Sequence, residues 1–292
     1  MTKVASFIAA SLLVSNAAAS DWDVTQVASI TTAAPTLNQG ATTNVASSNQ
    51  AVNAIVLDTT DDLVAGSQTA TLDSSTGLLL TQGSNVDSSN QAINLVDGFD
   101  LGGTTSITQT VLQTGTSTTL LTQKDVDATG SNVQAVNLGV AGNDITGLKQ
   151  VYTESDSVSL VQSDVVSSTN VQGLNYATAV EGIGGTELTQ SVTVATDATF
   201  VQGAGNVGGT NVQVGNAAVA NGAAASIANT AQTFTVTGGN LDLTQSVATV
   251  GGDTQAVNMI SATGATSTIS ATTTQDVIVT AGAVNFTQDA AI

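Results

Sequence analysis

The sequence predicts an all-β fold, a cross-β β-solenoid of about seven rungs of ~41 residues with stacked Gln/Asn ladders. Three observations predict it: glutamines recur at a fixed period, apolar and polar residues alternate around them, and no apolar pattern of helical period persists. Successive members of the first glutamine series are 42, 41, 41, 40, 42 and 43 residues apart. They are Gln26, Gln68, Gln109, Gln150, Gln190, Gln232 and Gln275.

Two further glutamine series keep the same period and stay in phase with the first over nearly the whole chain. The second series is Gln39, Gln82, Gln123, Gln162, Gln202, Gln245 and Gln288. The third series is Gln50, Gln91, Gln134, Gln172, Gln213 and Gln255. Chance glutamines in a low-complexity sequence would not hold three series in phase, so the pattern favours stacked repeats.

The residues around each series are typical of strands. In the first series Leu188, Gln190 and Val192 alternate with polar residues, which is the period of a β-strand. In the second series an apolar residue such as Phe200 comes two positions before the glutamine, and in the third an apolar residue such as Val136 comes two after it. The glutamines are therefore predicted to share the apolar, inward face.

A buried amide without partners costs roughly 2–7 kcal/mol, and stacking removes that cost. If rungs lie ~4.8 Å apart, each glutamine hydrogen-bonds its counterparts above and below, as in cross-β amide ladders. An asparagine three residues after the third series predicts another amide column, either pointing outward or capping backbone groups at a corner. These asparagines are Asn53, Asn94, Asn137, Asn175, Asn216 and Asn258.

The first residues are typical of a secretory signal peptide. Lys3 precedes an apolar stretch at 4–14, and three alanines at 17–19 form a small-residue cleavage site. The apolar stretch is too short to span a membrane. We therefore expect a signal peptide at 1–19, a single β-solenoid repeat domain at 20–292, and a secreted, extracellular or cell-surface protein. The sequence leaves open whether a rung is triangular, flattened or folded like a Greek key.

Charge and composition argue against several function classes. After signal removal, Lys124 and Lys149 stand against 22 acidic residues, so neither nucleic acid nor anionic membrane is an expected partner, and no membrane insertion is expected. Without histidine or cysteine, the usual general base and thiolate metal ligands are missing. We expect no enzyme activity, no catalytic or cofactor-binding residues and no metal site.

Two weaker motifs have simpler interpretations than a ligand site. The carboxylate pairs Asp61 with Asp62 and Asp125 with Asp127 do not recur between repeats, so we interpret them as solvated corner charges rather than a calcium site. The glycines at 203, 205 and 208 match G-x-G-x-x-G, but no βαβ unit follows, so a turn is expected rather than a dinucleotide cofactor.

The repeats resemble the subunits of bacterial functional amyloid, the curlin and Fap-type biofilm fibres. The resemblance rests on a secreted, histidine-free chain whose repeats keep a fixed Gln-to-Asn spacing, as from Gln50 to Asn53. It implies export across the outer membrane, with a secretion channel and a nucleator subunit as partners, and extracellular assembly.

The repeat pattern itself favours a homopolymer. The first glutamine lies close to the expected mature terminus and the last repeat has no third arm, so neither end has an expected cap. We therefore expect head-to-tail stacking. The alternatives are a monomeric β-helical surface adhesin and an ice-binding protein. The threonine-rich stretches at 116–122 and 266–274 are expected to shift phase between repeats, which disfavours an ice-binding face.

Overall fold

The described part of the chain folds into parallel β-structure. The computed structural model describes residues 12–13, 22–31, 36–39, 45–46, 49–57, 61–73, 77–83, 86–103, 106–124, 131–163, 169–203, 210–247 and 253–290. Within these ranges every helix or strand is a strand, and all paired strands run parallel. The strands form three large sheets and one two-stranded sheet.

The long sheet contains nine strands. They are β2 (Trp22–Ile30), β6 (Leu63–Leu72), β10 (Ile107–Gln113), β13 (Asp144–Glu154), β16 (Gly182–Val194), β19 (Ser226–Ile227), β20 (Thr230–Val236), β23 (Thr268–Ile269) and β24 (Thr274–Val279). Because β19 and β20 both pair with β16, these two strands lie at one level. The pair β23 and β24 continues them in the same way.

The short sheet and the curved sheet contain seven strands each. The short sheet is β3 (Thr36–Gln39), β7 (Leu79–Gln82), β11 (Thr119–Lys124), β14 (Val158–Ser163), β17 (Ala198–Gln202), β21 (Leu241–Val247) and β25 (Val284–Ala290). The curved sheet is β1 (Leu12–Leu13), β5 (Asn49–Val56), β9 (Asn90–Gly98), β12 (Asn132–Ala141), β15 (Thr169–Ala179), β18 (Thr210–Ala220) and β22 (Thr254–Ala262). A small sheet pairs β4 (Val45–Ala46) with β8 (Val86–Asp87).

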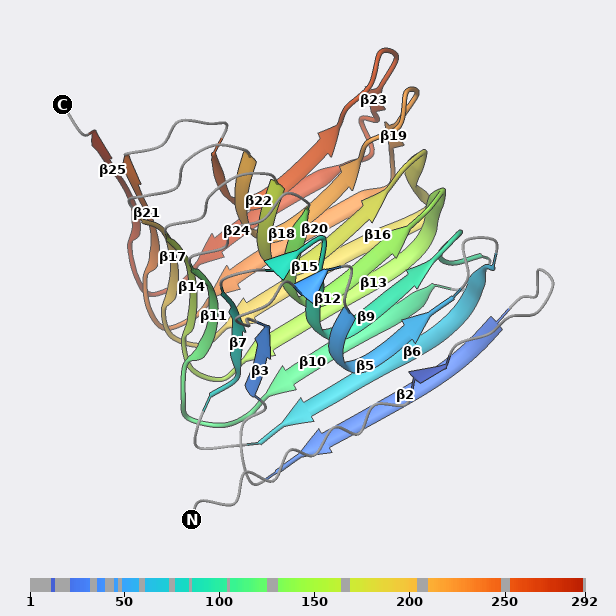
Figure 1. Cartoon of the computed structure of the whole chain (residues 1–292). Coiled ribbons are helices and arrows are strands. Elements are labelled where there is room, and N and C mark those ends of the chain that lie inside the picture. The colour runs from blue at the N-terminus through green and yellow to red at the C-terminus, as the bar shows by residue number, and fades with distance from the viewer. Residues whose placement is uncertain are drawn as a thin grey trace.

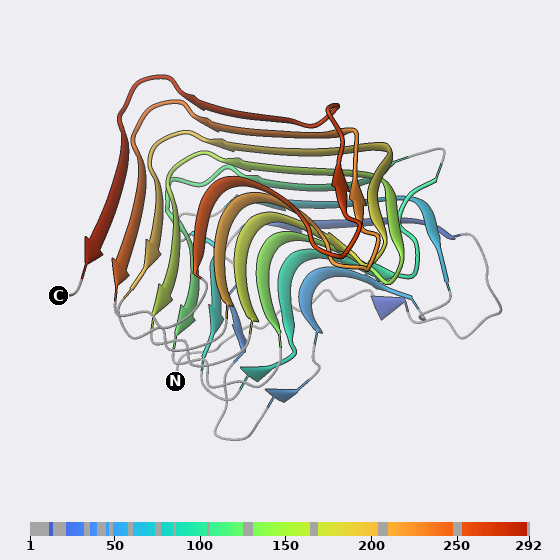
Figure 2. The same ribbon diagram turned by 90° about the horizontal axis from the view of Figure 1, so that it is seen from above.

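The chain visits the three large sheets in a fixed order. It passes from a long strand to a short strand, then to a curved strand, and from there to the next long strand, so neighbouring strands follow chain order from blue to red (Figure 1). Seen from above, the curved strands lie inside the angle between the long and short strands (Figure 2). The expected all-β fold of stacked parallel strands with amide ladders is confirmed, and it has the architecture of a β-solenoid.

The register places equivalent residues directly beside one another. Gln109 pairs with Gln68 on one side and with Gln150 on the other. In the curved sheet the pairing passes from Ala135 to Asn137 without including Val136, because the strand bends there. This bend turns the second half of each curved strand toward the long sheet (Figure 2).

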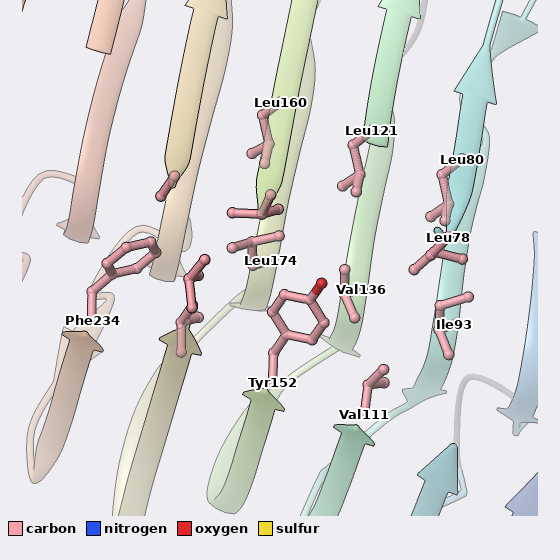
Figure 3. Packing of buried hydrophobic residues seen from close by; sticks show 14 of the residues in the cluster. Leu78, Leu80, Ile93, Val111, Leu121, Val136, Tyr152, Leu160, Leu174 and Phe234 are labelled. Carbon is pink, nitrogen blue, oxygen red and sulfur yellow. The ribbon is translucent and has the colours of Figure 1, made fainter. Parts of the chain in front are cut away.

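Three apolar clusters fill the stack. The first lies where all three sheets meet, with Leu121 from the short sheet, Tyr152 from the long sheet and Val136 from the curved sheet pointing toward one another (Figure 3). The second joins the far half of the curved sheet to the beginning of the long strands, for example Val96 and Ile107. The third covers the other face of the curved sheet.

The first described strand falls inside the expected signal peptide. β1 pairs with β5, with Leu12 beside Ala54 and Leu13 beside Ile55. It therefore occupies the edge of the curved sheet that removal of residues 1–19 would expose.

Candidate functional site

The first glutamine series forms one continuous column of hydrogen bonds inside the stack. Each Nε2 donates to the Oε1 of the preceding member over 2.7–2.9 Å, as from Gln150 to Gln109 and from Gln190 to Gln150. From Gln26 to Gln232 these side chains are buried. Strand register alone produces the column, because residues separated by one repeat lie ~4.8 Å apart across a parallel ladder.

The same amides also join the long sheet to the curved sheet. From Gln26 to Gln232 an N–H of the side-chain amide donates to a carbonyl of the facing curved strand, as from Gln150 to Tyr176 O over 3.1 Å and from Gln190 to Ala217 O over 2.8 Å. These carbonyls lie just past the bend of each curved strand. Both N–H groups of an interior glutamine such as Gln150 are therefore satisfied, one within the column and one by the facing sheet. We call the second hydrogen bond a clamp, because it joins two sheets.

The second and third glutamine series join the short sheet to the curved sheet in the same way. Gln123 in the short sheet donates to Gln82 Oε1 over 2.7 Å and to Val171 O over 3.0 Å. Gln134 in the curved sheet donates to Gln91 Oε1 over 2.7 Å and to Thr122 O over 3.1 Å. Amides of the short sheet thus donate to carbonyls of the curved sheet, and amides of the curved sheet donate to carbonyls of the short sheet.

The asparagine column lies inside the stack and runs with the opposite polarity. Asn94 donates to Asn137 Oδ1 over 2.9 Å and to Thr110 O of the long sheet over 3.1 Å. The alternative that these asparagines point outward is wrong, because the bend at residues such as Val136 brings them back to the interior. They cap backbone groups across a corner, which was the other interpretation.

A further amide column was missed by the sequence analysis. Asn132 donates to Asn170, Asn170 to Asn211, and Asn211 to the carboxylate of Asp253, over 2.8–3.2 Å. The three asparagines are buried. Each of these four residues precedes a third-series glutamine by two positions, so the signal was present in the sequence.

The columns end at a layer that is open to solvent. In the last strands of the long and short sheets, Gln275 and Gln288 are exposed, although Gln232 in β20, the strand that pairs with β24, is buried. Phe286 is 73% exposed, whereas Phe200 and Leu243 of the same apolar column are 0% and 3% exposed. The final layer therefore presents core-type side chains with nothing described beyond them.

One polar cluster interrupts the apolar core. The Tyr152 hydroxyl donates to Glu154 Oε2 over 2.6 Å, and both side chains are buried. Burial raises the pKa of Glu154 to about 7, against the opposing effect of the nearby Thr119 and Tyr152 hydroxyls. Burial, and then the Glu154 charge, raise the pKa of Tyr152. The amide of Gln113, beside Glu154 in the ladder, has no hydrogen-bond partner among the described residues.

The acidic residues differ in part from their expected placement. Asp61 is fully buried, so its interpretation as a solvated corner charge is wrong. Asp125, Asp127, Gly205 and Gly208 lie outside the described residues. Among the residues that the structure does describe, no three acidic side chains are grouped so that they could hold a metal ion.

The outer face of the long sheet carries short rows of aligned threonines that the sequence analysis did not identify. Thr153, Thr193 and Thr235 stand side by side on successive strands. Thr69 and Thr110 do so in the neighbouring column. These threonines lie outside the stretches at 116–122 and 266–274, where Thr122 stands beside Val161 and Thr274 beside Ala231, so the phase shift expected for those stretches is not contradicted.

Comparisons of the chain with protein-family models, with curated proteins and with solved structures gave no match. Over the described ranges, the structure contains no helix that could cross a membrane. The resemblance to curlin and Fap-type subunits therefore remains a prediction, and the function has to be argued from the geometry above.

Proposed function

We propose that this chain is a structural subunit that stacks head to tail, through about seven turns per copy, into extracellular amyloid-like fibres of a biofilm matrix or cell surface. The observation that carries this proposal is the open last layer. Phe286, Val277 and Gln275 belong to columns whose other members form the interior, yet here they face solvent. A parallel edge with exposed apolar side chains is a template for another chain.

A second copy fits this edge because its first layer presents the same columns in the same register. Phe286 ends the column that begins with Leu37, and Val277 ends the column that begins with Ala28. Translating the chain by its own length along the stack would place Leu37 on Phe286 and Ala28 on Val277. The apolar columns would then continue from one copy to the next without a change of register.

The polarity of the amide columns gives this docking a direction. In the short sheet each glutamine donates to its predecessor, ending with Gln288 donating to Gln245 Oε1 over 3.3 Å. Gln288 Oε1 therefore points toward the next layer as an acceptor. Gln39 of a second copy would supply the matching donor, whereas a head-to-head contact would oppose groups of one kind.

Composition supports a structural role outside the cell. The chain has no cysteine and no histidine, and it carries 22 acidic residues against three basic ones. Interior amides and apolar columns supply the cohesion that disulfides give many secreted domains. A secretion channel and a nucleator subunit are partners that only the family resemblance suggests.

Electron microscopy and fibre diffraction of the purified chain test the proposal. We expect unbranched, detergent-resistant fibres with a meridional spacing of ~4.7–4.8 Å. Replacing Val277 by Lys should block growth by placing a charge in an inward column at the open edge. The matched control is Val27→Lys, because Val27 is 71% exposed but points away from the interior. A chain that stays monomeric at high concentration, or equal fibre growth in both variants, would overturn the proposal.

The aligned hydroxyls of the long sheet favour a second candidate, an ice-binding protein. Thr153, Thr193 and Thr235 repeat at the strand spacing of ~4.8 Å on one face of the sheet. Such a regular array can order surface water over several strands. Thermal hysteresis of the purified protein measures this activity. We expect Thr193→Lys to abolish it and Thr244→Lys, in the short sheet, to preserve it, while absence of hysteresis in the unaltered protein excludes this function.

A further inference from the structure

The two ends of the stack differ by one curved strand. At the C-terminal end the long sheet finishes with β24 and the short sheet with β25, but the curved sheet finishes with β22, which precedes both in the chain. Among the described residues, no curved strand stands level with β24 and β25. The end of the stack therefore has a slot, one strand wide, beside β22.

The opposite end has a matching projection. β1 pairs with β5 on the side away from β9, and β5 belongs to the same turn as β2 and β3. β1 therefore extends one strand beyond the edges that β2 and β3 form. With β1 included, the curved sheet has as many strands as the short sheet, seven in each. The projection at one end has the width of the slot at the other.

We propose that the Leu12–Leu13 strand of a second copy fills the slot beside β22 when two copies stack. The proposal rests on the head-to-tail assembly proposed above and names the segment that completes its interface. Translation of one copy onto the next brings β2 against β24 and β3 against β25, and β1 then falls level with the missing curved strand. The stack continues without a gap in any of its three sheets.

The strand register at the slot fits this occupant. Leu12 belongs to the column that runs through Ala54 and Leu95 to Met259, and Leu13 belongs to the column that runs through Ile55 to Ile260. Met259 and Ile260 are partly exposed in the single chain and pack against two of the apolar clusters. The backbone register therefore places residues 12 and 13 of a second copy in line with both columns.

This inference gives the N-terminal segment a role that conflicts with its removal as a signal peptide. A chain cut after residue 19 could still stack through β2 and β3, but each junction would lack one curved strand. The N-terminal sequence of chains in mature fibres therefore bears directly on the inference. Fibres built from chains that start at residue 20 would overturn it.

Cysteine cross-linking of the full chain provides the sharper test, because the chain contains no native cysteine. In the double variant Leu12→Cys, Met259→Cys, docking places the two Cα atoms of different copies ~4.8 Å apart, within the usual disulfide range of about 4.4–6.8 Å. Within one copy the two positions are six strands apart, roughly 29 Å. Any disulfide that forms must therefore join two copies.

Two companion variants separate the inference from the assembly it rests on. Thr25→Cys, Thr274→Cys reports stacking through the long sheet, since these residues begin and end one exposed column. Leu12→Cys, Ser261→Cys is a register control, because Ser261 lies two residues beyond Met259. Under mild oxidation we expect covalent oligomers from the first two pairs, at least about tenfold above the control, since the control thiols lie beyond about 7 Å.

The outcomes then distinguish the two proposals. Cross-linking of Thr25→Cys, Thr274→Cys with only control levels for Leu12→Cys, Met259→Cys would show that copies stack but that β1 does not fill the slot. If neither pair cross-links, head-to-tail assembly itself is wrong. Cross-linking of both pairs in one register supports the complete junction.

Discussion

The middle of the stack and its last layer use the same residue types with opposite results. Gln190 is fully buried, receives a hydrogen bond from Gln232 and donates to Gln150 and to Ala217 O. Gln275 occupies the same column but is exposed and has a ladder partner on one side only. A turn of this chain therefore has no interior of its own. Its neighbours create the interior, which is why the last layer leaves core-type side chains exposed.

The largest effect is expected from removing an amide in the middle of the stack. Gln150→Leu leaves Gln109 Oε1 and Tyr176 O without the donor that now satisfies them. At about 1–3 kcal/mol for each stranded group, the free energy of unfolding should fall by about 2–6 kcal/mol. Denaturant unfolding of the soluble chain measures the loss.

The same change at the edge is the matched control. Gln288→Leu removes one exposed 3.3 Å hydrogen bond, so the free energy of unfolding should change by no more than about 0.5 kcal/mol. Equal losses in the two variants would contradict the distinction between interior and edge amides.

The free energy of unfolding should change by about 3 kcal/mol with pH because of the buried pair Tyr152 and Glu154. Glu154 has an ordinary pKa of 4.5 and a folded-state pKa of about 7. Between these values the folded chain holds a proton that the unfolded chain has released. The free energy of unfolding should therefore be highest below pH ~4.5 and fall as the pH rises to ~7, at ~1.4 kcal/mol per pH unit.

Glu154→Gln isolates this contribution. Its amide stays neutral and can still accept from the Tyr152 hydroxyl, so its unfolding should depend much less on pH, and it should be more stable than the unaltered chain at pH 8. Glu187→Gln, at an exposed position, serves as the control and should behave like the unaltered chain. Parallel pH profiles for Glu154→Gln and the unaltered chain would rule out Glu154 as the source.

A smaller loss is expected where a glycine makes room for a large neighbour. A Cβ on Gly215 would lie 2.5 Å from Cδ2 of Phe234 and 2.6 Å from Val257 O. Gly215→Ala should therefore cost about 1–3 kcal/mol of unfolding free energy through overpacking. Gly142→Ala is the control, because its new Cβ would meet nothing closer than 3.4 Å. If both variants unfold alike, the close contact with Phe234 is not a real constraint.

The Gly215 site shows where sequence reasoning succeeds and where it stops. The repeat predicts which residues share a column, because parallel in-register pairing places residues one repeat apart side by side. It cannot predict which columns face one another. Gly215 breaks the apolar pattern two residues after Gln213, and only the packed structure shows that Phe234, packed edge-on against Phe200 at 6.0 Å, fills that space.

The same limit explains the other errors. The clamps from Gln150 to Tyr176 O and from Asn94 to Thr110 O depend on the bend of the curved strands, and the spacing of residues contains no information about that bend. Likewise, the lack of a recurring carboxylate pair predicted that Asp61 is a solvated corner charge, but the fold buries this side chain. Columns could be predicted from the sequence, but the contacts between columns could not.

The smallest change in the free energy of unfolding of the single chain is expected from truncating Phe286 in the last layer. Phe286→Ala should change the free energy of unfolding of the soluble chain by less than about 0.5 kcal/mol, since this side chain is already 73% exposed. Phe200→Ala, in the same column, should cost about 3–5 kcal/mol. Fibre formation should nevertheless depend on Phe286, because a docked copy would bury this side chain. Losing that burial, about 1.5–3 kcal/mol, should raise the soluble concentration left at equilibrium by roughly 10- to 100-fold. A Phe286→Ala chain that leaves the same soluble concentration as the unaltered chain would show that this layer does not form the junction.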